Sequence, residues 1–480
     1  MPAIRHLTAA AVLLSGLTSF AADLPQTPGE PSPEFVEYGR QVFEFNFARP
    51  DRLPEGVKLG DGNGLGPLFN DVSCVSCHKQ GGVGGSGDLD SNVFMLGIVV
   101  RPIPEASIDQ IINSAQTIHS GLTDTKPTIV IQKFAVGSPD IVDGYDAWRT
   151  RLMNWFGADA ARVKPIRKEV GAATLELAQR NTPALWGMGI IENFRKEGGE
   201  KIRQRIADEI HGRRPWISGR PPVSVDGVEG WFGWRGQILT LDDMILAACA
   251  TECGLQVPGA QEAAFPRGIA SAKRALPAVS RGADLTPRQI AALIGFVAAI
   301  PPPQQAALTG QQEVQTRTGE RVFDRIGCSD CHVKDLGWVR GVYSDLLLHD
   351  MGDSDEDIQL TNPPKPKVTL QLVVGQSIDY SGGPAFQVAV VPVVVNGETI
   401  QQEQEWKTPP LWGVSDSAPY FHDGRAATLA SAIEMHDGEA RHSGQAYREL
   451  DEDDRSSLLA FLSSLKAPAN DPNTSVVQRP

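Results

Sequence analysis

The 480-residue chain has no excess of positive charge, because 44 Lys and Arg residues stand against 58 Asp and Glu residues and give a formal net charge of -14. Phosphate groups are bound by clusters of Lys and Arg, so this balance argues against nucleic acid as a partner. Long apolar segments are also scarce, since residues 7–17 are too few to cross a bilayer and no later stretch is as apolar over a greater length. The composition therefore indicates a globular chain of two or three domains without a membrane span.

The N-terminus has the pattern of a secretory signal peptide. Arg5 supplies the positive charge, residues 7–17 form the apolar segment, and Ser19-Phe20-Ala21 offers the small residues of a cleavage site. We expect residues 1–21 to be removed and the mature chain to be exported to the periplasm, with an uncleaved N-terminal anchor as the alternative. Residues 22–36 contain four prolines and are expected to form a flexible segment.

Cysteine is scarce as well: the chain has six, and four of them belong to two C-x-x-C-H motifs. The motifs are Cys74-Val-Ser-Cys77-His78 and Cys328-Ser-Asp-Cys331-His332. In this pattern two thiols form thioethers with the vinyl groups of a haem, and the adjacent imidazole binds its iron. A thioredoxin-like pair does not need the histidine, and zinc would need further ligands nearby. Two covalently bound haem c groups are therefore expected, with His78 and His332 as iron ligands.

The other two cysteines, Cys249 and Cys253, are four residues apart on an expected helix. Cysteines of exported proteins often pair, but a bridge between positions i and i+4 of a helix requires distortion. A disulfide and two buried free thiols both remain open.

Three segments of the first half recur in the same order in the second half. They are Gly39-Arg-Gln-Val-Phe43 with Gly319-Glu-Arg-Val-Phe323, Thr182-Pro-Ala-Leu-Trp-Gly187 with Thr408-Pro-Pro-Leu-Trp-Gly413, and residues 285–296 with residues 450–461. One such pair could arise by chance, whereas three pairs together with two haem motifs indicate two related domains.

The domain boundaries follow from this repeat and from three consecutive prolines at 301–303, which cannot continue a helix. We expect an N-terminal domain at 37–300 with the first haem, a linker at 301–312, a C-terminal domain at 313–467 with the second haem, and a tail at 468–480. The expected fold class is mainly α, with small β insertions. The strands are predicted at 97–102, 128–133, 368–374 and 385–395.

Each iron needs a sixth ligand or a vacant position, and the two halves differ in what they offer. Aligning Thr428-Leu429 with Thr240-Leu241 places His436 at the position of Ala248 and His422 at the position of Trp234. The second iron is therefore expected to be closed by His436, with Met435 as ligand, or a surface role for His436, as alternatives. The first iron is expected to be open and to form the substrate site.

The segment Ala418-Pro-Tyr-Phe-His-Asp-Gly-Arg-Ala-Ala-Thr-Leu429 resembles the signature of bacterial dihaem cytochrome c peroxidases. A closer resemblance is to the related di-haem oxidoreductase family, also labelled thiol-oxidoreductase-like, which has similar segments beginning at Thr182, Phe232, Tyr343 and Glu405. The resemblance covers nearly the whole mature chain. It implies two cytochrome c-like domains, with the active site at the N-terminal haem and the C-terminal haem supplying electrons.

The resemblance also implies roles for single residues. Trp234 would lie between the two haems, with a core tryptophan as the alternative, and His422 would belong to the haem environment without binding iron. Glu252 lies near the position of an acid–base glutamate, and a solvent-exposed carboxylate at a helix end is the alternative. A calcium ion between the domains stays open, since the sequence has no sharp calcium loop.

The sequence departs from the peroxidase pattern near the first haem. The histidine that caps the resting iron of the peroxidases is missing after the first motif, where Met95 or the distant His119 could substitute, and Met244 stands at the position of a glutamine. Three functions therefore stay in view: peroxidase-type reduction of peroxide, oxidation of a partner protein or a thiol, and electron transfer without catalysis. All three require a soluble redox protein as electron donor or acceptor.

Overall fold

The structure is a computed structural model, and its described part covers most of the expected mature chain. The described residues are 31–48, 65–99, 106–124, 126–158, 165–223, 228–260, 263–269, 284–303, 305, 308–352, 394–395, 398–399 and 404–468. The predicted signal peptide at 1–21, the predicted strand at 368–374 and most of the one at 385–395 lie outside these residues.

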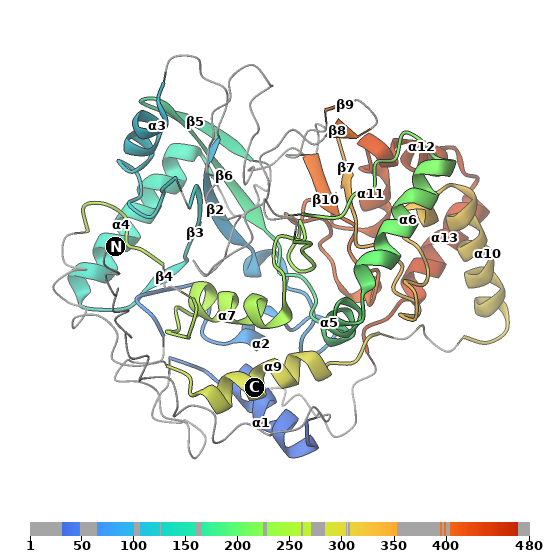
Figure 1. Cartoon of the computed structure of the whole chain (residues 1–480), viewed down its shortest axis with the longest axis horizontal. Helices are drawn as coiled ribbons and strands as arrows, with labels where there is room; N and C mark the ends of the chain where they lie inside the picture. Colours follow the sequence, from blue (N-terminus) through green and yellow to red (C-terminus); the bar gives the residue numbers. More distant parts are fainter. Residues whose placement is uncertain are drawn as a thin grey trace, which may run out of the picture.

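Helices form the larger share of the described residues (Figure 1). They are α1 (Pro33–Glu44), α2 (Cys74–Cys77), α3 (Ile108–Ala115), α4 (Pro139–Phe156), α5 (Met188–Lys196), α6 (Gly199–Arg213), α7 (Leu241–Glu252), α9 (Pro287–Ala299), α10 (Gln311–Arg325), α11 (Leu429–Glu434), α12 (Arg441–Glu449) and α13 (Glu452–Ser464). Among the residues described, none of these helices is both long enough and apolar enough to span a membrane.

An antiparallel sheet with the strand order β3-β2-β6-β5 gives the fold a mixed helix-and-sheet character. Its strands are β2 (Val93–Val99), β3 (Thr128–Ile131), β5 (Ile166–Val170) and β6 (Ala173–Arg180). Shorter pairs are β1 (Leu68–Phe69) with β4 (Phe134–Ala135), β7 (Leu348–Asp350) with β10 (Glu405–Lys407), and β8 (Val394–Val395) with β9 (Glu398–Thr399). Helices α3 and α4 lie beside the four-stranded sheet at one end of the molecule (Figure 1).

Of the four strands in this sheet, β2 and β3 were predicted from the sequence, and β5 and β6 were not. β2 and β3 overlap the strands predicted at 97–102 and 128–133. β5 was not predicted, because Arg167, Lys168 and Glu169 are consecutive charges that have no alternating apolar pattern. β5 is held in the sheet by its pairing with β6. On β6, Leu175 and Leu177 are buried in the same apolar cluster as Leu152 of α4.

Each half of the chain contains a pair of crossing helices that approach at a glycine. Gly39 of α1 lies against the carbonyl oxygen of Ala292 in α9, so close that a Cβ would overlap it. Gly319 of α10 lies against the carbonyl oxygen of Ser457 in α13 in the same way. These glycines belong to the repeated segments of the sequence, so the repeat corresponds to the same helix crossing formed twice.

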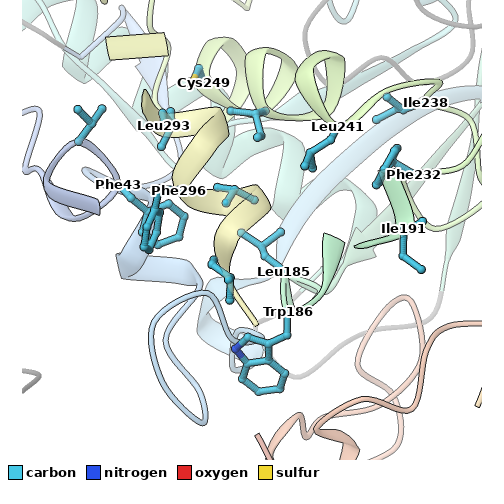
Figure 2. Close-up of a cluster of buried hydrophobic side chains, with 14 of the residues drawn as sticks. Phe43, Leu185, Trp186, Ile191, Phe232, Ile238, Leu241, Cys249, Leu293 and Phe296 are labelled. Carbon is cyan, nitrogen blue, oxygen red and sulfur yellow. The ribbon is translucent and has the colours of Figure 1, made fainter. Parts of the chain in front are cut away.

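Aromatic rings complete each crossing at equivalent positions. The rings of Phe43 and Phe296 have their centroids 5.3 Å apart in the first pair, and those of Phe323 and Phe461 are 5.4 Å apart in the second. Such tilted contacts stabilise helix packing beyond the area that they bury. Figure 2 shows Phe43 and Phe296 side by side in the core of the first half.

Replacing Gly319 by alanine is expected to destabilise the protein by about 1–3 kcal/mol, because the new methyl group has to push α10 away from α13. The midpoint of thermal unfolding measures this effect. Gly212 of α6 is a matched control, since nothing lies within 4 Å of the point that an added Cβ would occupy and alanine is the better helix former. Equal midpoints for the two variants would contradict the close helix approach.

The two repeated T-P-x-L-W-G segments contact each other reciprocally where the halves meet. A Cβ on Gly187 would overlap the indole ring of Trp412, and a Cβ on Gly413 would overlap the indole ring of Trp186. Both glycines have positive φ, of 71° and 64°, which glycine adopts without strain. Figure 2 places Trp186 at the edge of the core of the first half.

Two stretches of the first half, residues 199–223 and 228–235, contact the second half. Arg214 pairs with Asp330 at 3.1 Å, and the Ser218 hydroxyl donates to Glu439 at 2.5 Å. In Figure 1, α6 lies on the same side of the molecule as α10, α12 and α13. The halves therefore interlock through more than one surface.

Candidate functional site

The first C-x-x-C-H motif forms a short helix whose last residue is followed by a fixed imidazole. Ser73 caps α2 by accepting a hydrogen bond from the Ser76 N–H, and His78 Nδ1 lies 3.2 Å from the Gly85 carbonyl oxygen. Burial lowers the pKa of His78 to about 4. The ring is therefore neutral at pH 7, and with Nδ1 occupied its Nε2 is the atom that remains for iron.

The second motif has the same local construction. His332 Nδ1 lies 3.0 Å from the Tyr343 carbonyl oxygen, and burial lowers the pKa of His332 to about 4. Phe323 lies beside His332 with ring centroids 6.3 Å apart, and Phe43 lies beside His78 at 6.2 Å. Both histidines are thus oriented by a backbone carbonyl and an aromatic ring.

A cavity of about 340 Å³ adjoins the second motif. One wall is apolar and comes from α10, α11 and α13, while Cys328, Cys331 and His332 lie at its edge. The apolar residues are Phe323, Leu429, Ile433, Leu458 and Leu462. Its size falls within the range of about 300–1,000 Å³ that is typical of ligand and cofactor sites.

His436 faces the same cavity as His332. Its Nδ1 lies 2.7 Å from the Ala432 carbonyl oxygen, which leaves Nε2 for a ligand, and it is close enough for its charge to act on the pKa of His332. Burial lowers the pKa of His436 itself. Met435, the alternative, is 42% exposed and is not among the residues that line the cavity.

His422 lines the cavity but is held by other groups. Its ring stacks on Trp406 with centroids 3.4 Å apart and an interplanar angle of 6°, and its Nε2 lies 3.2 Å from Nη2 of Arg425. The guanidinium of Arg235 also lies over Trp406, 4.1 Å from the ring centroid. Nε2 of His422 is therefore hydrogen-bonded to Arg425. The role of His422 in the haem environment stays a prediction.

Trp234 lies where the two halves meet. Its Nε1 donates to the Asn181 carbonyl oxygen at 3.1 Å, and its own carbonyl oxygen accepts from the N–H of Lys407 at 3.1 Å. Its ring lines the cavity, and so does Met244 of α7. Trp234 thus contacts residues from both halves.

Glu252 ends α7 and lies beside the first motif. Its carboxylate accepts from Asn70 Nδ2 at 2.6 Å. Burial, followed by the charges of Asp71 and Glu252, raises the pKa of Cys77. Burial raises the pKa of Glu252 to about 7, against the opposing effects of Asn70 and Lys133. A carboxyl group with this pKa is able to exchange a proton near neutral pH.

The remaining candidates near the first motif lie in the protein core. Met95 is fully buried in β2 among Val93, Val130 and Ala178. His119 is buried against Trp148, with ring centroids 5.5 Å apart. Whether either residue caps the first iron stays a prediction.

Cys249 and Cys253 are free, buried thiols beside Cys74. The Cys74 side chain and burial raise the pKa of Cys253 well above its usual value, and burial does the same for Cys249. Both thiols are therefore protonated and unreactive at neutral pH. Of the two possibilities left open by the sequence, the structure has the free thiols.

A buried histidine between two carboxylates was not predicted from the sequence. His349 Nε2 lies 2.8 Å from Asp345, its Nδ1 lies 2.8 Å from Glu439, and the Cys331 sulfur is 3.6 Å from Nδ1. Burial alone would lower the pKa of His349, but the charges of Cys331 and Asp345 raise it well above its usual value. The i, i+4 spacing of Asp345 and His349 was visible in the sequence, whereas Glu439 is 90 residues away from His349.

An asparagine pair that joins the halves was not predicted either. Asn181 Nδ2 donates to Asn92 Oδ1 at 3.0 Å, and Asn92 Nδ2 donates to the Asp423 carbonyl oxygen at 3.0 Å. The Asn181 N–H donates to the His422 carbonyl oxygen at 2.7 Å. These bonds fix the loop of His422 against the first half.

Comparison with known proteins finds the family that the sequence resembles over part of the chain. Residues 397–465 match the family described as "Di-haem oxidoreductase, putative peroxidase", whose description implies haem as cofactor. The chain is 27% identical over 164 residues to hydrazine synthase subunit gamma of Kuenenia stuttgartiensis, a match that covers 32% of this chain and only 43% of that protein.

Two solved structures are similar in part. One is hydrazine synthase of Kuenenia stuttgartiensis pressurized with xenon, with 21% identity over 38% of this chain and 57% of that chain, and a TM-score of 0.24. The other is a MauG-like protein associated with microbial copper homeostasis, with 16% identity over 93% of this chain and 95% of that chain, and a TM-score of 0.34.

Proposed function

We propose that this chain is a di-haem oxidoreductase, an exported c-type cytochrome with peroxidase-type chemistry at its N-terminal haem, and the family match over residues 397–465 supports this proposal. The observation that carries the proposal is an asymmetry between the halves. His332 and His436 face one cavity, whereas Ala248 stands at the position equivalent to His436 in the first half. One iron would be saturated and relay electrons, and the other would keep a position for substrate.

The capping of two helices supports the alignment behind this asymmetry. Thr240 is the N-cap of α7 and Thr428 is the N-cap of α11, and each side chain accepts a hydrogen bond from the third residue of its helix. Ala248 and His436 both follow their cap by eight residues. A methyl group cannot bind iron, so the first half offers no ligand at this position.

We further propose two cytochrome c-like domains, at 37–300 and 313–467, joined by the linker at 301–312. The repeated glycine crossing of α1 with α9 and of α10 with α13 supports this division. Each domain would hold one haem c through the two cysteines and the histidine of its motif. Residues 1–21 would be the cleaved signal, and the mature protein would be periplasmic.

Different residues of the chain would then hold the haems and transfer protons. When bound, haem supplies iron for one-electron and peroxide chemistry. His78 and His332 would hold the two irons, and their carbonyl partners fix the orientation of each ring. Glu252 would move a proton between the two oxygens of peroxide, because hydroxide is a poor leaving group.

Trp234 would connect the domains for electron transfer. It is hydrogen-bonded to Asn181 of the first half and to Lys407 of the second half, so it connects the two halves directly. A soluble redox protein would deliver the electrons to the C-terminal haem. Calcium between the domains stays open, and so does oxidation of a partner protein or a thiol in place of peroxide reduction.

Spectra of the pure ferric protein with and without cyanide, together with a pyridine haem count, test the proposal. We expect two haems and one bound cyanide per chain, and reduction of hydrogen peroxide by the reduced protein faster than by a simple monohaem cytochrome. A wholly low-spin spectrum without cyanide binding would instead identify an electron-transfer protein. Peroxide turnover no faster than the monohaem control would reject the peroxidase interpretation.

A further inference from the structure

The cavity beside the second motif has an unpartnered hydrogen-bond donor in its wall. Trp412 lines the cavity and is 6% exposed, and its Nε1 is buried without an acceptor among the residues described. A buried N–H without an acceptor costs about 1–3 kcal/mol, so such a group in a native protein normally marks a missing partner. The partner expected here is an acceptor that enters the cavity.

A buried cation lines the same cavity. Lys407 Nζ donates to the Trp231 carbonyl oxygen at 2.7 Å, and within the described part of the chain no carboxylate forms an ion pair with it. Burial, followed by the charge of Arg203, lowers the pKa of Lys407 to about 7. An ammonium group with only a neutral carbonyl for a partner is costly to bury, and an anion in the cavity would offset that cost.

The neighbouring charges leave this anion position unfilled by protein. Arg203 is already paired with Glu229, and its guanidinium lies 3.5 Å from the centroid of Trp231. Glu439, an acidic residue of the cavity wall, is bonded to His349 and Ser218. Lys407 and Trp412 therefore add a cation and a hydrogen-bond donor to a cavity lining that is otherwise mainly apolar, as at α11 and α13.

We propose that Trp412 Nε1 and Lys407 Nζ bind the propionate carboxylates of the haem attached to Cys328 and Cys331. This inference rests on the proposed function, because it takes haem as the occupant of the cavity. A haem has a large apolar surface and one edge with two carboxylates, and the lining of this cavity combines apolar residues with Lys407 and Trp412. Ammonium and indole N–H groups both donate hydrogen bonds to carboxylates, and the bond from the charged group is the stronger.

The location gives these contacts a consequence for electron transfer. The N–H of Lys407 donates to the Trp234 carbonyl oxygen, and the Trp412 ring packs on Gly187 of the first half. Carboxylates bound by these two residues would lie at the junction of the halves. A positive charge beside that edge favours the ferrous state, which carries one more negative charge than the ferric state.

The test measures the reduction potential of the low-spin haem in the holoprotein by spectroelectrochemistry. For Lys407→Met we expect a lower potential, equivalent to about a tenfold shift in the ferric–ferrous equilibrium constant, which is 59 mV for one electron. Lys407→Arg keeps the positive charge, so its reduction potential should lie closer to the wild-type value than that of Lys407→Met. For Trp412→Phe we expect a shift in the propionate bending modes of the resonance Raman spectrum, which a loss of packing alone would not produce.

Trp338→Phe is the control, because it makes the same change at an indole that is 45% exposed and is not among the residues that line the cavity. It should leave the propionate modes unchanged. This inference would be overturned, and the proposed function left standing, by three results together. The protein would bind two haems per chain, Lys407→Met would leave the potential unaltered, and Trp412→Phe would leave the propionate modes unaltered. A haem count below two in the wild-type protein would overturn the proposed function itself.

Discussion

Replacing His436 by alanine should raise the number of cyanide molecules bound per chain from one to two and convert the second haem from low spin to high spin. The reason is the arrangement of the cavity, in which His436 Nε2 remains available while its Nδ1 is bonded to the Ala432 carbonyl oxygen. Alanine recreates at this position the methyl group that Ala248 has in the first half. Ferric absorption spectra and a cyanide titration measure the change, which involves a whole coordination site.

Met435→Ala is the control for that experiment. Met435 is the adjacent residue and the alternative ligand, and its side chain is 42% exposed. Its removal should leave the spectrum and the cyanide stoichiometry as in the wild type. The reverse pattern, with an altered spectrum for Met435→Ala and a wild-type spectrum for His436→Ala, would transfer the ligand role to the methionine.

Replacing Glu252 by glutamine should lower peroxide turnover by about 10²–10⁴-fold, the usual contribution of a positioned acid–base group. Glutamine keeps the shape and a hydrogen-bonding oxygen for Asn70, but it cannot carry the proton. Steady-state peroxide reduction measures the loss, while the haem count and cyanide binding should stay unchanged. Asp242→Asn, the same type of change on the exposed first turn of α7, should have wild-type turnover.

The pH dependence of stability follows from the same carboxyl group. The pKa of Glu252 is about 7 in the folded chain against an ordinary value of 4.5, so folding takes up a proton between pH 4.5 and 7. Stability from this group is therefore fully present below about pH 4.5 and decreases as the pH rises toward 7. Chemical denaturation at several pH values should show that the free energy of unfolding depends less on pH for Glu252→Gln than for the wild type. The same pH dependence in both proteins would mean that the carboxyl group is exposed to water.

The local pattern of the sequence was sufficient for the features that depend on residues close together in the chain. The two C-x-x-C-H motifs and the repeated glycines predicted a duplicated frame, and the helix crossings at Gly39 and Gly319 agree with it. The alignment of Thr240 with Thr428 also has a structural basis, because both residues cap helices. Such features are encoded by spacing, which a single sequence displays.

Features that depend on distant residues could not be predicted in this way. β5 is stabilised by its pairing with β6 and not by its own apolar pattern, so its charges were misleading. Lys407 and Trp412 were visible as part of a family-like segment, but the cavity that they share with His332 exists only in the folded chain. Likewise, the contact of Glu439 with His349 requires two segments to come together.

The reciprocal contact of Trp186 with Gly413 and of Trp412 with Gly187 has a consequence for the symmetry of the junction between the halves. When residue i of one unit touches residue j of another, and j of the first touches i of the second, the contact is of the kind that two identical subunits make about a two-fold axis. The two T-P-x-L-W-G segments therefore meet about a local, approximate two-fold axis. A bulkier residue at either glycine would displace the tryptophan of the other segment, so the two segments can change only together.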